Sequence, residues 1–376
     1  MKNQLFVDII LKSKKSEKIK NSYALQNEEK LLKEKGGNNP ITEMNKKLNG
    51  YIISEYFEIL NYIGKGGSGI VFQGKFKKIK TDKFAAIKFI IQKNSEAQRK
   101  NKNKANENHM EIIIHNRLKH KNIPDIYGFY QINEGTCIAM EFCKYDLPNF
   151  KKQILKKCFS ETLICYISFQ ILEAILNLQK NHIIHLDIKP QNILIDEYLN
   201  VKLCDFSISL NYKSTEKNLN LQRAGTSYFI SPEVLEEKTI ELSEASKIDI
   251  YSFGVLIYLL SYYDYPYNLN KINDKDYPKI LKNIQDNELE FPQKVKHSQM
   301  LQNFLIKCLE KDIKKRYNIF DAMADPWIKG HEFIFDEKEK LNNGCKFLMN
   351  MMADNIFEFN KYIKQRCKPI FLKYFF

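Results

Sequence analysis

The sequence predicts a protein of the α+β class, because strand-like runs, a helical stretch and a further strand-like run follow one another along the chain. Three apolar runs with the composition of β-strands come first: FEILNYI, VFQGKF and FAAIKFI. A stretch with helical character, HMEIIIHNRLKH, follows them, and another apolar run, VKLCD, ends at Asp205. The chain has 376 residues and 44% hydrophobic content, which is enough to fill the core of a globular protein.

The first two runs enclose the glycine-rich segment IGKGGSGIV. Its glycines are Gly64, Gly66, Gly67 and Gly69. A strand on each side predicts a hairpin, whereas a dinucleotide-binding fold would place a helix after the glycines. Glycine at these positions allows the backbone to close over a triphosphate without a side-chain clash. The alternative is a hairpin that is softened by glycine and binds no ligand.

The third run is interrupted by a charge at Lys88, which is costly to bury without a partner. The candidate partner is Glu111, in the helical stretch that follows. A glutamate that faces back toward the strand would hold Lys88 against the α and β phosphates of a nucleotide. The alternative is a lysine at a strand edge whose ammonium group reaches solvent.

The segment HLDIKPQN combines a carboxylate, a lysine and an amide, a set that suits phosphoryl transfer. In that reaction Asp187 accepts the proton of the attacking hydroxyl, and Lys189 offsets the charge that develops on the phosphoryl group. Asn192 supplies one ligand to Mg²⁺, and Asp205 at the end of its strand suits a second metal contact. The alternative is a polar turn that happens to contain these residue types.

In this order, the motifs resemble those of the eukaryotic protein kinase family, over about residues 56–328. The resemblance implies a two-lobed fold, with a five-stranded antiparallel sheet plus one helix in the small lobe, a mainly helical large lobe, and ATP between them. It also implies that Lys88 and Glu111 form an ion pair, that Asp187 is the catalytic base, and that Asn192 and Asp205 bind Mg²⁺.

The resemblance assigns further residues to nucleotide binding. Val71 and Ala86 are expected to pack on the adenine, and Met140 corresponds to the gatekeeper beside it. The hinge that recognises the base would run from Glu141 to Cys143, and Asp146 would reach a ribose hydroxyl. The glycine-rich segment contributes Ile63, Gly64, Lys65, Gly66, Gly67, Ser68, Gly69, Ile70 and Val71.

The second half continues the resemblance. GTSYFISPE is similar to the substrate-binding loop of the family, and its Glu233 would form a buried ion pair with Arg316. KIDIYSFGVLIYLL supplies Asp249 and resembles the apolar central helix of the large lobe. Lys189 together with Thr226 is similar to the serine/threonine branch, which implies a protein substrate with a Ser or Thr acceptor.

Three residues depart from the family pattern. Leu186 replaces an arginine that normally meets a phosphorylated activation segment, so we expect activity without phosphorylation of that segment. Ser207 replaces the glycine of DFG, which predicts a harder flip to the inactive conformation. His115 is expected to pack as a neutral core residue. The first two departures leave open an alternative, a pseudokinase that binds ATP as a scaffold or regulatory module.

Composition bounds the partners and the compartment. The net charge is +14, but the lysine clusters lie among Asn and Ser without aromatic residues, which argues against specific nucleic-acid binding. An acidic or calmodulin-like regulator stays a candidate partner. No run approaches the roughly 18 uninterrupted apolar residues of a transmembrane helix. The eight cysteines form no CxxC pair. We therefore expect a monomer in the cytoplasm, or in the nucleus, without a transmembrane segment.

The two ends differ in character. Residues 1–55 are polar and basic and are predicted to form a flexible arm with at most one short helix. Residues 329–376 form an apolar C-terminal extension that must bury its Met, Phe and Tyr side chains. Three interpretations of this extension remain: an extra helix on the large lobe, an autoinhibitory or calmodulin-binding segment, and a hydrophobic motif that docks on the small lobe.

Overall fold

The computed structural model describes residues 40–330 except 80, 82, 92–101, 134, 156–157, 197–199 and 213–216. The chain divides into two compact units. The N-terminal unit contains the described residues up to Lys119 together with Pro124–Phe142. The C-terminal unit contains His120–Ile123 and the chain from Cys143 onward. The final boundary between the two units therefore lies between Phe142 and Cys143, within the segment expected to form the hinge.

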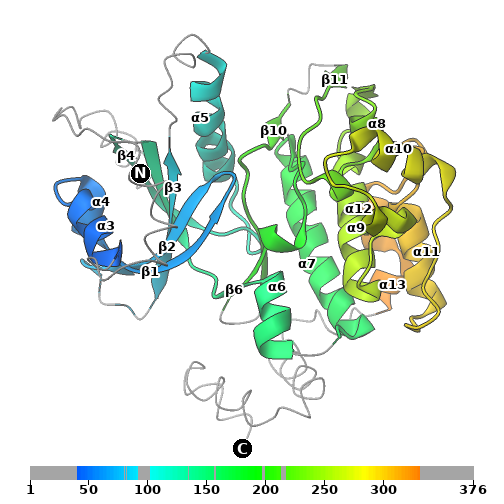
Figure 1. The fold of residues 1–376 in the computed structure, drawn as a ribbon, viewed down its shortest axis with the longest axis horizontal. Helices are drawn as coiled ribbons and strands as arrows, with labels where there is room; N and C mark the ends of the chain where they lie inside the picture. Colours follow the sequence, from blue (N-terminus) through cyan, green and yellow to red (C-terminus); the bar gives the residue numbers. More distant parts are fainter. Residues whose placement is uncertain are drawn as a thin grey trace, which may run out of the picture. The chain divides into compact units, whose positions relative to one another are not determined.

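The N-terminal unit is built on a five-stranded antiparallel sheet in the order β1-β2-β3-β5-β4, as the sequence predicted (Figure 1). Its strands are β1 (Phe57–Gly66), β2 (Gly69–Phe76), β3 (Phe84–Ile91), β4 (Ile126–Ile132) and β5 (Gly135–Glu141). Its helices are α3 (Pro40–Leu48), α4 (Ile52–Tyr56) and α5 (Lys102–Arg117). The expected hairpin is confirmed, because Gly66 pairs with Gly69 across the β1–β2 turn.

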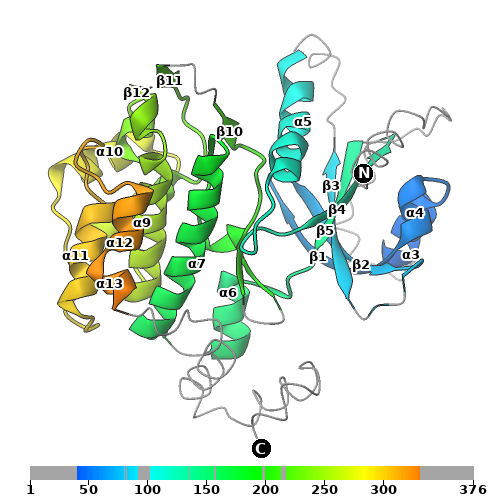
Figure 2. The same cartoon turned by 180° about the vertical axis from the view of Figure 1, so that it is seen from behind.

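Both faces of this sheet are apolar, because successive side chains of a strand point to opposite faces. One face packs with α3 and α4, and the other packs with α5. Figures 1 and 2 show these helices on opposite sides of the sheet. The first face includes Ile59, Phe72, Ile87, Phe89 and Ala139, and the second includes Ala86, Ile90, Ile138 and Met140.

Residues 40–55 were predicted to belong to a flexible arm, and the structure corrects this. Met44 and Leu48 of α3 and Ile53 of α4 are buried against the sheet. The side chain of Asn45 accepts a hydrogen bond from the Ile59 N–H at 2.9 Å and donates one to the Ile59 carbonyl oxygen at 2.8 Å. Because β1 is an edge strand, its outer backbone groups need partners, and Asn45 supplies them at this point.

The C-terminal unit is mainly helical. Its longest helix is α7 (Glu161–Lys180), which begins at the N-cap Ser160. The apolar central helix predicted from the sequence is α9 (Lys247–Tyr262), in which every residue except Leu259 is buried. The other α-helices are α6 (Leu147–Phe150), α8 (Pro232–Leu235), α10 (Tyr277–Asp286), α11 (Gln299–Cys308), α12 (Ile319–Ala324) and α13 (Pro326–Lys329).

Short strands join the loops of this unit. They are β6 (Tyr145–Asp146), β7 (Ile183–Ile184), β8 (Ile193–Ile195), β9 (Val201–Leu203), β10 (Leu210–Asn211), β11 (Asn218–Asn220) and β12 (Thr239–Glu241). They form one three-stranded sheet, β6-β8-β9, and two ladders, β10 with β7 and β11 with β12. These pairings place the segments that carry the site residues beside one another.

The loop His120–Ile123 belongs to the C-terminal unit, and a buried asparagine makes several of its contacts there. The side-chain amide of Asn122 donates to Gln170 Oε1 at 3.0 Å and to the Val201 carbonyl oxygen at 2.7 Å. The Leu203 N–H donates to the Asn122 carbonyl oxygen at 2.9 Å. Four residues between α5 and β4 are therefore fixed on α7 and β9, although their sequence neighbours on both sides belong to the N-terminal unit.

Among the described helices, α7 alone has the length and apolar composition that would allow it to cross a membrane. Of its most apolar window, 61% is buried inside the protein, as expected for a core helix of a globular domain. The residues outside the described ranges include 1–39 and 331–376. The rest of the basic arm and nearly all of the C-terminal extension, with its three interpretations, therefore lie outside the described residues and stay predictions.

Candidate functional site

The glycine-rich turn leaves open space where a phosphate could lie. A Cβ atom built on Gly64, Gly66 or Gly67 would meet no other atom within 4 Å. Gly69 differs, because its φ of +150° is unfavourable for other residues and a Cβ there would overlap the carbonyl oxygen of Phe89. Gly69 is thus required for the close approach of β2 to β3, whereas the other three glycines keep the surface of the turn clear.

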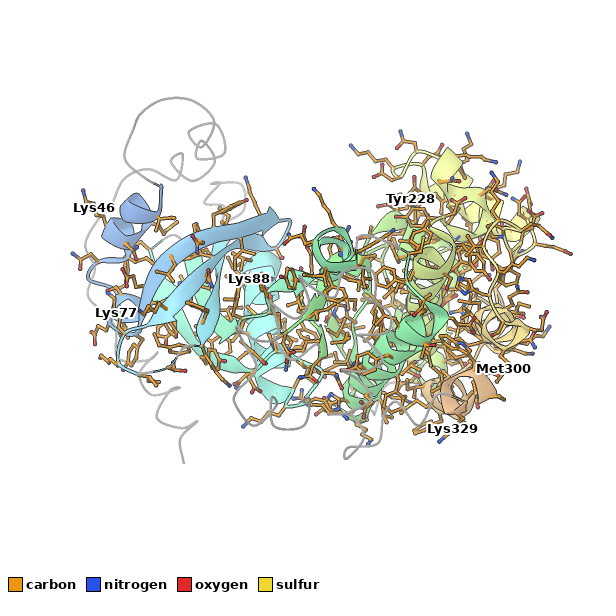
Figure 3. The ribbon with its side chains drawn as sticks, turned by 90° about the horizontal axis from the view of Figure 1, so that it is seen from below. Lys46, Lys77, Lys88, Tyr228, Met300 and Lys329 are labelled. Atoms are coloured by element: carbon orange, nitrogen blue, oxygen red, sulfur yellow. The ribbon has the colours of Figure 1, made fainter. Side chains whose placement is uncertain are left out.

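Lys88 and Glu111 form the predicted ion pair, with Lys88 Nζ 2.5 Å from Glu111 Oε1. Both side chains are buried, with exposed fractions of 7% and 5%. Figure 3 shows Lys88 within the N-terminal unit, whereas Lys46 and Lys77 lie at its surface. A buried lysine needs such a carboxylate partner. Lys88 is therefore not a lysine whose ammonium group reaches solvent.

The residues predicted to surround the nucleotide base share one face of the sheet. Val71 pairs with Lys88 across β2 and β3, and Ala86 pairs with Met140 across β3 and β5. Residues opposite each other in a ladder point to the same face, as do residues two apart in a strand. Val71, Ala86, Lys88 and Met140 therefore lie together on the face that packs with α5.

The hinge residues and Asp146 are held by local hydrogen bonds. Glu141 Oε2 accepts a hydrogen bond from the Asp125 N–H at 3.1 Å, and the Glu141 N–H donates to the Asp125 carbonyl oxygen at 2.7 Å. Cys143 is buried. Asp146, expected to reach a ribose, is the N-cap of α6 and accepts a hydrogen bond from the Asn149 N–H at 2.7 Å through Oδ1.

Asp187 is surrounded by donors in the C-terminal unit. Its Oδ2 lies 2.7 Å from Lys189 Nζ and accepts a hydrogen bond from the Asn192 amide at 3.0 Å. Its Oδ1 accepts from the Thr226 N–H at 3.1 Å and from the Thr226 hydroxyl at 2.9 Å. Four donors on the two oxygens match the four lone-pair sites of an ionised carboxylate, which is therefore fixed in orientation.

The predicted metal ligands Asn192 and Asp205 lie at adjacent strand ends. Ile193 of β8 pairs with Leu203 of β9, and the Cys204 N–H donates to the Asn192 carbonyl oxygen at 3.0 Å. The Asn192 amide nitrogen donates to both the main-chain oxygen and Oδ2 of Asp187. Because the amide is planar, Oδ1 of Asn192 then faces the other side. An amide oxygen and a carboxylate are ligands that suit Mg²⁺.

Asp249 of α9 holds the start of the loop that carries Asp187. Its Oδ2 accepts the His185 N–H at 2.8 Å, and its Oδ1 accepts the Leu186 N–H at 3.0 Å. Burial raises the pKa of Asp249, and the hydrogen bonds from these two main-chain donors act in the opposite direction. Leu186 has a φ of 66°, an uncommon conformation for leucine that the two bonds stabilise.

The second predicted ion pair is also present. Arg316 donates from Nη1 to Glu233 Oε1 at 2.7 Å and from Nη2 to Glu233 Oε2 at 2.8 Å. The exposed fractions of the two side chains are 0% and 6%. This bidentate geometry joins α8 to the loop before α12. His115 is likewise buried as expected, and its Nε2 lies 2.8 Å from the Pro124 carbonyl oxygen.

Two contributors to the site were not singled out as site residues from the sequence. Thr226 was used to indicate the branch of the family, yet its hydroxyl also accepts from Lys189 Nζ at 2.8 Å. Gly225 has a φ of +102°, and a Cβ there would overlap the carbonyl oxygen of Leu186. The sequence signal was the GT at the start of GTSYFISPE. The contact of Thr226 with Asp187 spans 39 residues, so no local pattern shows it.

Several curated proteins are similar to this chain. Serine/threonine-protein kinase dst2 of Dictyostelium discoideum is 31% identical over 294 residues, which cover 76% of this chain and 23% of that protein. Calcium-dependent protein kinase 6 of Plasmodium berghei is 31% identical over 344 residues, 87% of this chain and 22% of that protein. Aurora kinase of D. discoideum is 27% identical over 275 residues, 73% of this chain and 66% of that protein.

The chain spans less than a quarter of the length of the first two relatives. A family model described as "Protein kinase domain" matches residues 57–328. The matched region contains the glycine-rich hairpin, the Lys88–Glu111 pair, the Asp187 loop and the Glu233–Arg316 pair. The chain therefore belongs to the eukaryotic protein kinase family, serine/threonine type.

Proposed function

We propose that this chain transfers the γ-phosphoryl group of ATP to Ser or Thr hydroxyls of protein substrates, with Asp187 as the catalytic base. In this step the acceptor oxygen bonds to the γ-phosphorus, the bond to the bridging oxygen breaks and ADP leaves. The hydroxyl proton passes to Asp187. The observation that carries the proposal is the fixed Asp187 carboxylate, with Lys189, Asn192 and Thr226 around it.

The Thr226 hydroxyl supports a short side-chain acceptor. It donates to Asp187 Oδ1 at 2.9 Å and accepts from Lys189 Nζ at 2.8 Å. An attacking hydroxyl needs the same two contacts, a base for its proton and a cation for the charge that develops. A hydroxyl on the β-carbon therefore reaches both groups. All four lone-pair sites of Asp187 are occupied, so a substrate hydroxyl must displace one of the present donors.

Other residues would hold the nucleotide. Gly64, Gly66 and Gly67 would approach the phosphates with their backbone, and Lys88 would bind the phosphates while Glu111 keeps it charged and oriented. Asn192 and Asp205 offer oxygen ligands to Mg²⁺. When bound, Mg²⁺ neutralises charge on the phosphates. The Asp146 carboxylate already caps α6, so it would bind a ribose hydroxyl while keeping this capping hydrogen bond.

We further propose that activity does not depend on phosphorylation of the activation segment. Leu186 offers no cation to a phosphate. The described parts of the segment are already fixed by main-chain ladders: Leu210–Asn211 pairs with β7, and Asn218–Asn220 pairs with Thr239–Glu241. Arg223 adds a hydrogen bond from Nε to the Leu235 carbonyl oxygen at 2.9 Å. These contacts supply the order that a phosphate would otherwise provide.

The test is transfer of labelled phosphate from Mg·ATP to a generic Ser/Thr protein, with phosphatase-treated wild type beside Asp187→Asn. We expect transfer by the wild type and none by the variant, while both bind ATP. If phosphate transfer occurred only after the activation segment had been phosphorylated, the proposed independence from that phosphorylation would be wrong. ATP binding without transfer by the wild type would favour the scaffold. Because one relative is named a calcium-dependent kinase, a parallel sample with Ca²⁺ and calmodulin tests for that regulator.

A further inference from the structure

The turn that contains Asp205 contacts a buried residue, His185. This histidine has an exposed fraction of 0%, so each of its polar atoms needs a partner inside the protein. Its N–H donates to Asp249, and its Nε2 lies 3.0 Å from the Cys204 carbonyl oxygen. Its Nδ1 accepts the Asp187 N–H at 3.2 Å. Both ring nitrogens thus have a partner inside the protein.

The remaining polar atom, the His185 carbonyl oxygen, accepts a hydrogen bond from the Ser209 hydroxyl at 3.1 Å. Ser209 lies in the turn that follows Asp205, and its own N–H donates to the Phe206 carbonyl oxygen at 3.2 Å. The ring of Phe206 packs on the ring of His185, with the centroids 5.2 Å apart. Cys204, Phe206 and Ser209 thus contact the same histidine at three points.

Asp205 is enclosed by these contacts and has a φ of 67°. A left-handed conformation costs an aspartate free energy, so the surrounding structure must maintain it. Maintaining this conformation needs contacts both before and after Asp205 in the chain. Cys204 supplies the contact before Asp205, and Ser209 supplies the hydrogen bond after it, just before β10 begins at Leu210.

We propose that Ser209 is a positioning residue, which holds the Asp205 turn on His185 and so keeps the Asp205 carboxylate where Mg²⁺ would bind. This inference rests on the proposed function as far as the role of Asp205 is concerned. The expectation for Ser207, a harder flip to the inactive conformation, concerns backbone freedom and stays a prediction. The backbone of Ser207 has no positive φ, and among the residues that the structure describes its side chain makes no hydrogen bond. Of the two serines, Ser209 is therefore the one whose hydroxyl restrains the turn.

The experiment compares the full-length chain with Ser209→Ala, with Ser209→Thr, which keeps a hydroxyl, and with Ser207→Ala as the matched control. Hydrogen exchange of the amides from Ser209 to Tyr212 measures the tether directly. We expect exchange about fivefold faster in Ser209→Ala, the effect of one net hydrogen bond, and wild-type rates in the other two.

Calorimetry of ATP binding at increasing Mg²⁺ concentration measures the positioning of Asp205. We expect the half-saturating Mg²⁺ concentration to rise about fivefold in Ser209→Ala, and to return to the wild-type value in Ser209→Thr. Unchanged exchange in Ser209→Ala would overturn the tether. Faster exchange with an unchanged Mg²⁺ requirement would overturn the positioning role. Failure of the proposed function shows differently, as wild type that binds no Mg·ATP, and the exchange rates then decide on the tether alone.

Discussion

A single histidine, His297, lies between two oxygen acceptors in the C-terminal unit. Its Nδ1 is 3.4 Å from Glu161 Oε2, and its Nε2 is 3.0 Å from the Ser261 carbonyl oxygen. The edge of the ring meets Tyr262, with the centroids 5.2 Å apart. The hydrogen bond to Glu161 raises the pKa of His297, although burial acts against it. Both ring nitrogens therefore donate, and the imidazolium form fits this site.

The sign of the pH dependence follows from these shifts. The pKa of His297 is raised in the folded protein, so its contribution to stability is complete below about pH 6.5 and is lost as pH rises through the folded pKa. Burial raises the pKa of Glu161, but hydrogen bonds from His297, Ser298 and Trp327 lower it to about 2. The contribution of Glu161 is complete above about pH 4.5 and is lost toward pH 2.

We predict that His297→Asn lowers the free energy of unfolding most between about pH 4.5 and 6.5, and progressively less as the pH rises through the raised pKa of His297. Denaturant unfolding of wild type and variant at pH 5.5, 7 and 8.5 measures this difference. Tyr262 titrates outside the window, since burial raises its pKa to about 12. An effect of the substitution that is equal at all three pH values would show that His297 is neutral.

The buried pair Glu233–Arg316 supplies a second prediction. Glu233→Gln leaves the Arg316 guanidinium buried without a counter-charge, and we expect a loss of about 3–5 kcal/mol in the free energy of unfolding. The control is Glu55→Gln in the exposed pair with Lys78, whose side chains are 59% and 52% exposed. That change should cost less than about 1 kcal/mol. Similar losses in urea denaturation of both variants would refute a special role of burial.

Residues within short motifs could be predicted from the sequence, and residues that act across long separations could not. Lys88, Asp187 and Asn192 belong to patterns whose chemistry fixes their spacing, and the structure gives each the expected neighbours. The contacts of Ser209 with His185 and of His297 with Glu161 depend on how the chain folds back over 24 and more than 100 residues. Neither serine nor histidine carries a local signal for such a partner.

At the scale of elements, α3 is the departure from the prediction. Its sequence PITEMNKKL is mostly polar, and Ile41, Met44 and Leu48 mark a narrow apolar side at helical spacing. Three apolar residues in a nine-residue helix give only a short periodic signal, and the GGNNP segment before them indicated a break in structure. The strands of the sheet were predictable because their β-type runs are richer in apolar residues and are flanked by turns. The hydrogen bond between Asn45 and Ile59 of β1 is a tertiary contact, and no local sequence pattern predicts it.

We expect Met44→Ala to lower the free energy of unfolding by about 2–5 kcal/mol, since Met44 is 3% exposed in the core beneath α3. Lys46→Ala on the same helix is the control, because Lys46 is exposed (Figure 3). It should change stability by less than about 0.5 kcal/mol. Thermal unfolding followed by circular dichroism measures both. If the two variants melt alike, α3 is not part of the folded unit in solution.

For the whole molecule, the fold class and the two units follow from the order of the motifs, and the boundary between Phe142 and Cys143 lies within the expected hinge segment. The boundary at the loop between α5 and β4 was not predicted. It depends on Asn122, whose amide meets Gln170 and Val201, residues that lie 48 and 79 positions away. A polar residue in a short loop gives no sign of which unit will bury it.

We predict that a fragment of residues 40–142 does not fold cooperatively. In the fragment Asn122 and its neighbours lack Gln170 and Val201, so a segment in the middle of the unit loses its hydrogen bonds. Calorimetry of the fragment should show a broad transition, and addition of a fragment of residues 143–376 should restore a sharp one. A sharp transition of the first fragment alone would show that the loop needs no support from the C-terminal unit.

The interleaving of the two units along the chain matters for recombination between related kinases. A crossover placed at the hinge alone would join an N-terminal parent to a C-terminal parent, but the loop His120–Ile123 would come from the wrong parent. Asn122 from one parent would then have to hydrogen-bond with the residues at positions 170 and 201 from the other parent. Chimeras that exchange residues 120–123 along with the C-terminal unit keep these partners together, and we expect them to be more stable than chimeras that exchange the unit without the loop.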